Sequence, residues 1–505
     1  MTHPTATPCS VIDGRAARVG ETDFAAVLLS LALLGGGWTA GCSAEGTQLT
    51  PAEGASVLVT LLDAGAPRRS SAYGFERPTT PFLEMLASEG TRFDDASAAA
   101  PYTLASVASL FTGLSADAHR VLQAGDTLPD DVPTLAESFQ AGGYATFGLS
   151  SNGHIHRRFG FNRGFEPFEF HHARLDATPH HQVPERLWAS LRAQLDRVSS
   201  DQRPFFGYVH LMPPHAPYDP PEVFRTRLAP EAQDALLGSM EHLTPLTVGL
   251  RQAEAAEAER IARLYDASFA YADSQLAELQ SELLVRGLDQ NLVWVVLSDH
   301  GEAFGEHGLF QHSGRVDEEM LRSLLLWRLP KSARRGALRG GQTVKTPLST
   351  AALGATLLDL VGLEPLPTRT RRARLESFLQ RLNGSGEQPV VARTAGPGPT
   401  TSYRDGNWKL IHYAQSGRYE LFDLGTDPGE RSDLVAREPE RVERLQAALA
   451  EYRQTERPQG GSRRVALTPE LRQELEALGY RWGAESPTES GAGSTASQET
   501  DAPPR

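Results

Sequence analysis

Two continuous apolar runs, each ending in residues that can bind a metal, constrain this chain most strongly. The run SVLVTLL at 56–62 is followed by Asp63 and a glycine turn, and the run LVWVVLS at 292–298 is followed by Asp299 and His300. A strand that is buried on both faces, as in a parallel sheet covered by helices, has this continuous apolar pattern. Because ligands of open α/β sheets gather at the carboxyl ends of strands, the two runs predict one shared site.

The segments around these runs alternate between helical and strand patterns. The stretches TTPFLEMLASEG and VPTLAESFQAGGY have helical spacing with glycine stops, and PFFGYVHLM predicts a strand followed by a proline-rich loop. Residues 260–288 keep apolar side chains on one face, which predicts a long amphipathic helix leading to the Asp299 strand. The order predicts an α/β fold with a mostly parallel sheet.

The character of the chain changes beyond residue 330. Residues 401–430 predict two or three antiparallel strands joined by Asp-Gly and Ser-Gly turns, and residues 438–454 predict a helix packed on them. The Ser-, Thr-, Gly-, Glu- and Pro-rich residues 485–505 predict a disordered tail. We therefore divide the body into a main domain, 56–370, and a C-terminal subdomain, 371–484.

The N-terminal segment predicts an exported protein. Arginines precede an apolar stretch that is too short for a spanning helix, and small residues follow it up to Cys42. The run Thr39-Ala40-Gly41-Cys42 resembles a bacterial lipobox, which predicts lipidation of Cys42 and a periplasmic or cell-envelope location on a membrane anchor. We expect residues 1–42 to be a lipoprotein-type signal peptide and 43–55 a linker; an uncleaved N-terminal anchor is the alternative.

Composition limits the partners of the body. The 505 residues carry a formal net charge of −14, which disfavours nucleic acid or an anionic lipid surface as the main partner. An anionic substrate must therefore be attracted by a local site, such as a metal. The two cysteines, Cys9 and Cys42, both precede the body, so the body has neither a disulfide nor a cysteine zinc site.

The strand ends supply the strongest candidates for metal binding. Two carboxylates and an imidazole, from Asp63, Asp299 and His300, suit one divalent cation: Ca²⁺, Mn²⁺, Mg²⁺ or Zn²⁺. The alternative is that the two aspartates only cap the next helices.

Three further residues are candidates for chemistry. His215 lies in a proline-bracketed loop after a strand, and His312 follows a glycine-rich loop, where histidine can serve as acid, base or anion ligand. Thr103 begins a helical pattern and is either its N-cap or a nucleophile beside a metal. Spacing alone leaves both alternatives open.

Six segments, in order from about Ser56 to Leu434, resemble the sulfatase branch of the alkaline phosphatase superfamily. They are LLDAG with AYGFERPTTPFLEMLASEGTRF, APYTLASVASLFTGL, GYATFGLSSN with FGFNRGFEPF, YVHLMPPHAPYDPP, SDHGEAFGEHGLFQH, and RDGNWKLIHY with YELFDLGTDPGE. The resemblance implies an alkaline-phosphatase-like three-layer sandwich, with a central mostly parallel sheet flanked by helices and a small C-terminal antiparallel sheet with a helix. It implies that residues 56–370 are the catalytic domain.

The resemblance also implies a role for each candidate. The family's metal positions are occupied by Asp63, Asp299 and His300. His215 and His312 stand where the family binds the anionic group and protonates the leaving oxygen, and Thr103 stands at the nucleophile.

The sequence departs from the family pattern around the nucleophile. The family reads CxPSR or SxPSR and oxidises its Cys or Ser to formylglycine, whereas residues 103–107 read TLASV, and threonine cannot be converted. Ala105 and Val107 thus replace the proline and the basic residue. Three further polar partners of the family pattern are replaced, by Ala66, Arg68 and Ala352.

These features predict a metal-dependent hydrolase that uses a threonine nucleophile on sulfate or phosphate/phosphonate esters, with a small-molecule or glycan anionic ester as substrate. Since formylglycine helps to release sulfate, threonine favours phosphoryl or phosphonyl transfer. Two alternatives stay open: a catalytically degenerate binding protein of the same fold, and a transferase of phosphoryl-linked headgroups to envelope components.

Overall fold

The computed structural model describes residues 52–171, 185–234, 236–312, 314–334, 340–366, 376–382, 388–396, 398–456 and 462–477. The predicted signal peptide, the lipidation site at Cys42, most of the linker and the tail at 485–505 lie outside the described residues. The last linker residues pack against the body, because Ala52 and Ala55 are buried and the Ala52 N–H donates to the Leu360 carbonyl at 2.6 Å. The boundary at residue 370 stays a prediction.

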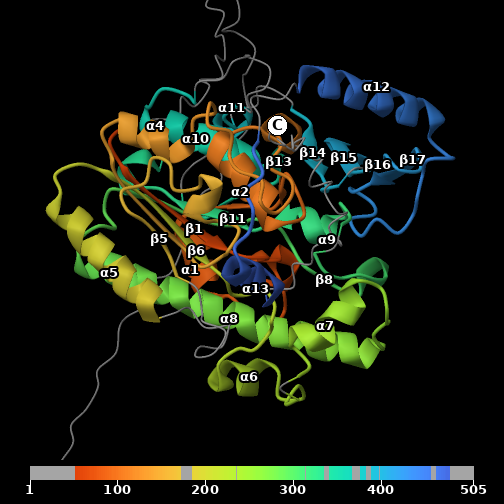
Figure 1. Cartoon of the computed structure of the whole chain (residues 1–505), viewed down its shortest axis with the longest axis horizontal. Coiled ribbons are helices and arrows are strands. Elements are labelled where there is room, and N and C mark those ends of the chain that lie inside the picture. Colours follow the sequence, from red (N-terminus) through yellow and green to blue (C-terminus); the bar gives the residue numbers. More distant parts are fainter. Residues whose placement is uncertain are drawn as a thin grey trace, which may run out of the picture. The chain divides into compact units, whose positions relative to one another are not determined.

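An eight-stranded sheet forms the centre of the described body (Figure 1). Its order is β12 (Gln342–Val344), β2 (Thr91–Phe93), β11 (Leu325–Arg328), β7 (Leu292–Ser298), β1 (Ser56–Leu62), β6 (Phe205–Leu211), β4 (Ala145–Ser150), β5 (Phe168–Phe170). β1 runs parallel to β6 and β7, with Leu62 beside Leu211 and Ser298, and β11 is antiparallel to its neighbours. The predicted mostly parallel sheet is confirmed, and the residues after β1, β6 and β7 leave one edge together.

Helices cover both faces of the sheet, which explains the continuous apolar runs. In β1, Val57, Val59 and Leu61 pack into one hydrophobic cluster, whereas Leu58 and Leu62 pack into the other. The first cluster includes residues of α2 (Thr103–Thr112), α4 (Leu135–Ala141) and α10 (Leu353–Val361); the second includes residues of α1 (Pro81–Glu89), α5 (Glu185–Ser200) and α8 (Ala255–Val285). Strands buried on both faces between helical layers confirm the three-layer sandwich.

The long amphipathic helix predicted at 260–288 is α8, which begins earlier and ends earlier, at Ala255–Val285. Its sheet-facing side is buried from Ile261 to Leu283. Two shorter helices, α6 (Glu222–Leu228) and α7 (Met240–Thr247), precede it in the chain after β6. No helix among these described segments is both long enough and apolar enough to cross a membrane.

A separate antiparallel sheet follows the main body. Its strands are β14 (Val390–Arg393), β15 (Thr400–Asp405), β16 (Trp408–Tyr413) and β17 (Arg418–Asp423), and α12 (Pro439–Thr455) packs on one face. The predicted turns are present, with Gly406 and Gly417 at φ of +59° and +71°, where glycine carries no Cβ penalty. The strands predicted within residues 401–430 are confirmed as β15, β16 and β17, and β14, which precedes that stretch, adds a fourth strand to the sheet.

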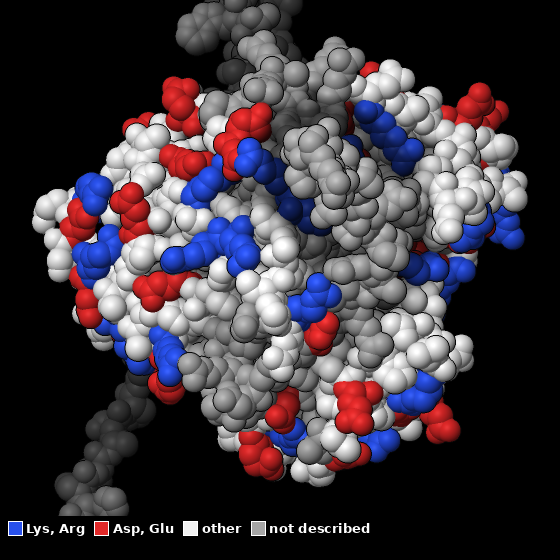
Figure 2. Space-filling model, viewed as in Figure 1, with Lys and Arg blue, Asp and Glu red and all other residues white. Residues whose placement is uncertain are grey.

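Buried ion pairs join this sheet to the main body. Lys409 of β16 donates to Glu318 at 2.9 Å and lies 2.9 Å from Glu430, and Arg404 of β15 makes a bidentate pair with Asp95. On the exposed face shown in Figure 2, acidic and basic side chains are interspersed. The net negative charge therefore forms no single patch on that face.

The remaining α-helices and strands of the described residues have two to nine residues. They are α3 (Ala116–His119), α9 (Glu318–Leu321), α11 (Leu379–Leu382), α13 (Pro469–Ala477), β3 (Ala96–Ser97), β8 (Ala303–Phe304), β9 (Phe310–Gln311), β10 (Arg322–Ser323) and β13 (Leu348–Ser349).

Candidate active site

Asp63 leaves the end of β1 and is fully buried. One carboxylate oxygen, Oδ2, accepts hydrogen bonds from Asn152 Nδ2 at 2.6 Å and from His210 Nε2 at 2.9 Å. Burial alone would raise the pKa of Asp63, but the surrounding histidines, His215 foremost, hold that pKa below its ordinary value. The site therefore keeps a buried negative charge at this position.

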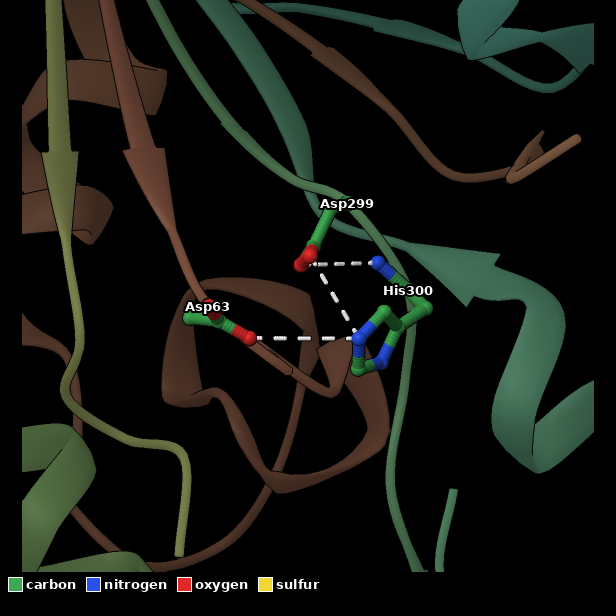
Figure 3. A group of neighbouring side chains, drawn as sticks. All are labelled: Asp63, Asp299 and His300. Carbon is green, nitrogen blue, oxygen red and sulfur yellow. Dashed lines mark hydrogen bonds and ion pairs between the residues drawn. The ribbon is translucent and has the colours of Figure 1, made fainter. Parts of the chain in front are cut away.

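Asp299 and His300 leave the neighbouring strand, β7 (Figure 3). Asp299 Oδ1 accepts from the backbone N–H groups of Ala64 at 3.1 Å and His300 at 3.0 Å, whereas Asp299 Oδ2 is buried without a hydrogen-bond partner. The Nδ1 of His300 lies 2.9 Å from the Gly301 carbonyl, so this nitrogen carries the proton and donates it. The other nitrogen, Nε2, faces Asp299 Oδ2 at 3.4 Å and Asp63 Oδ1 at 3.8 Å.

These three residues fit a divalent cation. One ligand atom from each of Asp63, Asp299 and His300 lies within 4.8 Å of the others. Two carboxylate oxygens and an imidazole nitrogen whose tautomer is fixed by a carbonyl form a usual donor set for such ions. The buried, unpartnered oxygen of Asp299 is the kind of atom that a cation would satisfy.

Thr103 points into the same cluster. It is the first residue of α2, the N-cap position belongs to Tyr102, and Tyr102 makes no capping side-chain bond, so the alternative that Thr103 is the N-cap is wrong. Its hydroxyl lies 3.4 Å from Asp63 Oδ1 and 3.4 Å from His300 Nε2. The N-terminal end of α2 also faces the site, where the helix dipole favours a bound anion.

The residues that replace the family motif lie in the core. Ala105 and Val107 are fully buried, and Val107 packs in a hydrophobic cluster of the sheet. Ser106 instead donates its hydroxyl to the Asp299 carbonyl at 2.6 Å. This bond ties the first turn of α2 to the end of β7, so the nucleophile and the metal group are held together.

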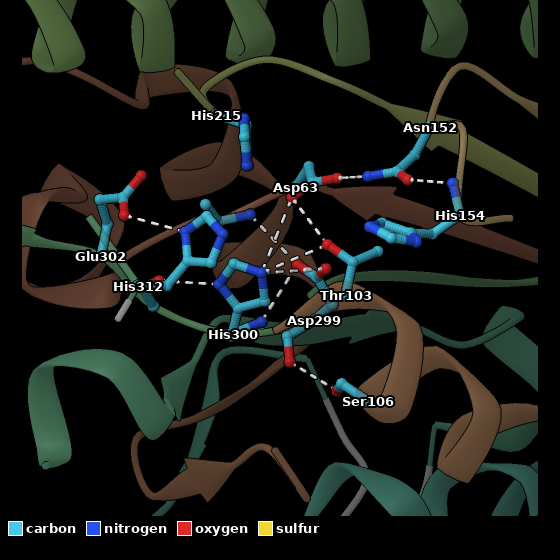
Figure 4. Close-up of polar contacts among 12 residues, drawn as sticks. Asp63, Thr103, Ser106, Asn152, His154, His215, Asp299, His300, Glu302 and His312 are labelled. Atoms are coloured by element: carbon cyan, nitrogen blue, oxygen red, sulfur yellow. Dashed lines mark hydrogen bonds and ion pairs between the residues drawn. The ribbon is translucent and has the colours of Figure 1, made fainter. Parts of the chain in front are cut away.

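The structure brings both predicted histidines to the cluster (Figure 4). The rings of His215 and His312 are 4.9 Å apart, and His312 is 4.3 Å from His300. His312 Nδ1 lies 3.2 Å from Glu302 Oε1, and His215 Nδ1 lies 2.5 Å from the Ala216 carbonyl. Burial, with His300 nearby, lowers the pKa of His312. All six predicted site residues thus meet at one sheet edge.

Three residues of this site were not predicted from the sequence. Asn152 follows β4 and bonds both Asp63 and the backbone N–H of His154, at 2.6 and 2.8 Å. His154 is buried beside the cluster, and burial lowers its pKa to about 3. His210, within β6, is oriented by the Tyr208 hydroxyl at 3.0 Å. Two signals were available: polar residues directly after the apolar run of β4, and a histidine inside an otherwise apolar strand.

The loop after Asp63 replaces family polar residues with other contacts. The N–H of Ala66 donates to the Tyr265 hydroxyl at 2.7 Å. Arg68 donates to the Glu302 carbonyl at 2.8 Å and pairs with Glu306. Although these two residues differ from the family pattern, their hydrogen bonds and ion pair therefore hold the loop after Asp63 in place.

Comparisons with known proteins agree with this geometry. The family model described as Sulfatase matches residues 56–363. The ulvan-active sulfatase of Formosa agariphila is 24% identical over 386 residues, which cover 71% of this chain and 72% of that protein. An arylsulfatase of Clostridium perfringens is 23% identical over 74% of this chain and 89% of its own length. The crystal structure of the phosphonate monoester hydrolase of Agrobacterium radiobacter matches with a TM-score of 0.64 at 20% identity, covering 82% of this chain and 98% of that one.

Proposed function

The chain belongs to the sulfatase family and is a hydrolase of ester bonds, and on this premise we propose that it hydrolyses sulfate, phosphate or phosphonate esters with Thr103 as its nucleophile. The observation that supports this proposal most directly is that the buried Thr103 hydroxyl lies 3.4 Å from both Asp63 and His300. A threonine there cannot become formylglycine, so its own oxygen must attack.

Asp63, Asp299 and His300 would hold the divalent cation. When bound, the cation supplies Lewis-acid stabilisation of the ester oxygens and of the threonine alkoxide. The protein adds the N-terminal end of α2, whose dipole favours the transferring anionic group.

The first step exchanges one ester bond for another. Thr103 Oγ1 gives up its proton, which passes to the solvent, and forms a bond to sulfur or phosphorus while the bond from that atom to the alcohol oxygen breaks. The leaving oxygen takes a proton from His215 or His312, whose rings lie side by side at the cluster. Water then hydrolyses the ester on Thr103 and regenerates the hydroxyl.

The substrate is a small-molecule or glycan ester, and phosphoryl or phosphonyl esters suit the threonine better than sulfate esters. Water releases the phosphoryl group of a phosphorylated threonine more readily than it releases the sulfate of a sulfated threonine. Formylglycine helps to release sulfate, and this chain has threonine in its place. The relatives named an ulvan-active sulfatase and a phosphonate monoester hydrolase make both ester types reasonable probes.

The test is turnover by the body of the protein with Mn²⁺, Ca²⁺ or Zn²⁺ on aryl sulfates, phosphate mono- and diesters and phosphonates. We expect hydrolysis of at least one ester class by the wild type and none by Thr103→Ala. Metal binding without turnover of any ester would instead support a binding protein of this fold.

Export and lipidation at Cys42 belong to the same proposal, because the lipobox-like run precedes the body. We expect the full chain to sediment with membranes in a bacterial host and Cys42→Ser to be released into the soluble fraction. Equal distribution of the two proteins would contradict lipidation.

A further inference from the structure

The residue directly before His312 has a strained backbone. Gln311 is buried and has φ of +58°, a conformation that residues with a side chain rarely adopt. Glycine would adopt this conformation at little cost. Such strain persists only where the surroundings over-determine the conformation, and it is concentrated at functional sites.

The side chain of Gln311 is held by α7. The Thr247 hydroxyl donates to Gln311 Oε1 at 2.5 Å, and Gln311 Nε2 lies 3.7 Å from Met240 Sδ. Figure 1 shows α7 close to β8, and β9, which pairs with β8, contacts α7. Both ends of α7 thus contact one buried amide.

α7 is itself anchored to the long helix α8. His242 of α7 lies 2.7 Å from Glu257, which also accepts from Arg251 at 2.8 Å. Because α8 packs on the central sheet, this contact gives α7 a fixed position from which to hold Gln311.

From these contacts we propose that Gln311 and Thr247 are positioning residues for His312. Their hydrogen bond keeps Gln311 in its left-handed conformation, and this conformation aims the His312 ring at Glu302 and His300. The inference rests on the proposed role of His312 at the ester. It adds residues of α7, outside the strand ends that carry the metal group, to those that position His312.

The chain offers a matched control. Thr247 and Thr244 both lie on α7, both are half-buried, and the hydroxyl oxygen of each lies close to the carbonyl four residues earlier, at 3.0 and 2.6 Å. Of the two, Thr247 is the one that bonds Gln311. We expect Thr247→Val to lower kcat about ten- to hundredfold with KM little changed, since small misplacement of a catalytic group has effects of that size. Thr244→Val and Thr247→Ser should keep wild-type kcat.

A double-mutant cycle distinguishes positioning from general damage. In the His312→Ala background, Thr247→Val should have no further effect on kcat, because the group it positions is gone. Loss of kcat of equal size in both backgrounds, or in Thr244→Val, would overturn the inference. If the wild type and His312→Ala are equally active, the proposed function of His312 fails instead.

A structural readout needs no turnover. The crystal structure of Thr247→Val should show Gln311 relaxed to negative φ and the His312 ring moved away from Glu302. An unchanged Gln311 and His312 in that structure would overturn the inference whatever the activity.

Discussion

Thr103 differs from a surface threonine in what surrounds its hydroxyl. The side chain is fully buried and lies at the first residue of α2, with a charged carboxylate and a tautomer-fixed imidazole at 3.4 Å. Burying a hydroxyl beside charged groups costs free energy, because the hydroxyl gives up hydration and rotamer freedom, unless it hydrogen-bonds to those groups. These contacts account for a threonine at this position better than helix capping does.

His119 carries a pH dependence of stability that is separate from catalysis. It is fully buried, with Nε2 2.9 Å from the Ser109 hydroxyl and Nδ1 accepting from the Val121 N–H at 2.9 Å. Burial lowers its pKa from 6.5 to about 3. As the pH falls, His119 therefore binds a proton in the unfolded state before it does so in the folded state. The free energy of unfolding decreases as the pH falls from 6.5 towards 3, by about 1.4 kcal/mol per pH unit.

Urea unfolding between pH 4.5 and 7.5 measures this dependence. We expect His119→Gln, which can keep both hydrogen bonds, to lose about one proton from the pH slope of the unfolding free energy. An unchanged slope would show that His119 does not stay neutral in the folded state.

At the scale of elements, the site exists because two parallel strands end at the same level. Leu62 of β1 pairs with Ser298 of β7, so the next residues, Asp63 and Asp299, leave the sheet together. α2 is then fixed against β7 through Ser106. The sheet register, rather than any one loop, sets the spacing of the metal group and the nucleophile.

We expect the buried ammonium group of Lys409, in β16, to contribute most to holding the C-terminal sheet against the main body. Lys409 contacts Glu318 and Glu430, and although burial lowers its pKa, these two carboxylates raise it overall. Lys409→Met would leave the buried Glu430 without its cation, whereas Glu318 would keep Arg322 at 2.8 Å, and removing one partner of a buried ion pair costs about 3–5 kcal/mol. The measurement is the free energy of unfolding in urea.

An exposed ion pair in the same sheet is the control. Arg418 of β17 pairs with Glu420 and is about half exposed, so Arg418→Ala should cost less than about 1 kcal/mol. Similar losses in the two variants would contradict a special role for the buried lysine.

At the scale of the whole molecule, much of the fold could be predicted from the sequence. The apolar runs identified β1 and β7, and their terminal polar residues identified Asp63, Asp299 and His300, because both patterns are local. His154 and Gln311 were missed. The burial of His154 beside Asp63 and the contact of Gln311 with α7 depend on tertiary packing, which no local pattern records.

Metal binding should stabilise the whole fold, because the three ligands exist as a group only in the native state. At a Mn²⁺ concentration a hundredfold above Kd, we expect about 2.7 kcal/mol of added stability and a matching rise in Tm. Asp299→Asn should abolish the rise. Asp273→Asn, at a buried aspartate that accepts from the N–H groups of Phe82 and Leu83, should keep it. A rise in both variants would place the cation elsewhere.

The covalent ester on Thr103 is the central claim, and mass spectrometry of acid-quenched enzyme tests it most directly. A 4-nitrophenyl phosphonate or sulfate makes the first step fast, so the ester on the protein accumulates. We predict one phosphonyl or sulfuryl group on the peptide that contains Thr103, and neither adduct nor turnover in Thr103→Ala. Turnover by Thr103→Ala at the wild-type rate, or an adduct on another residue, would contradict the account.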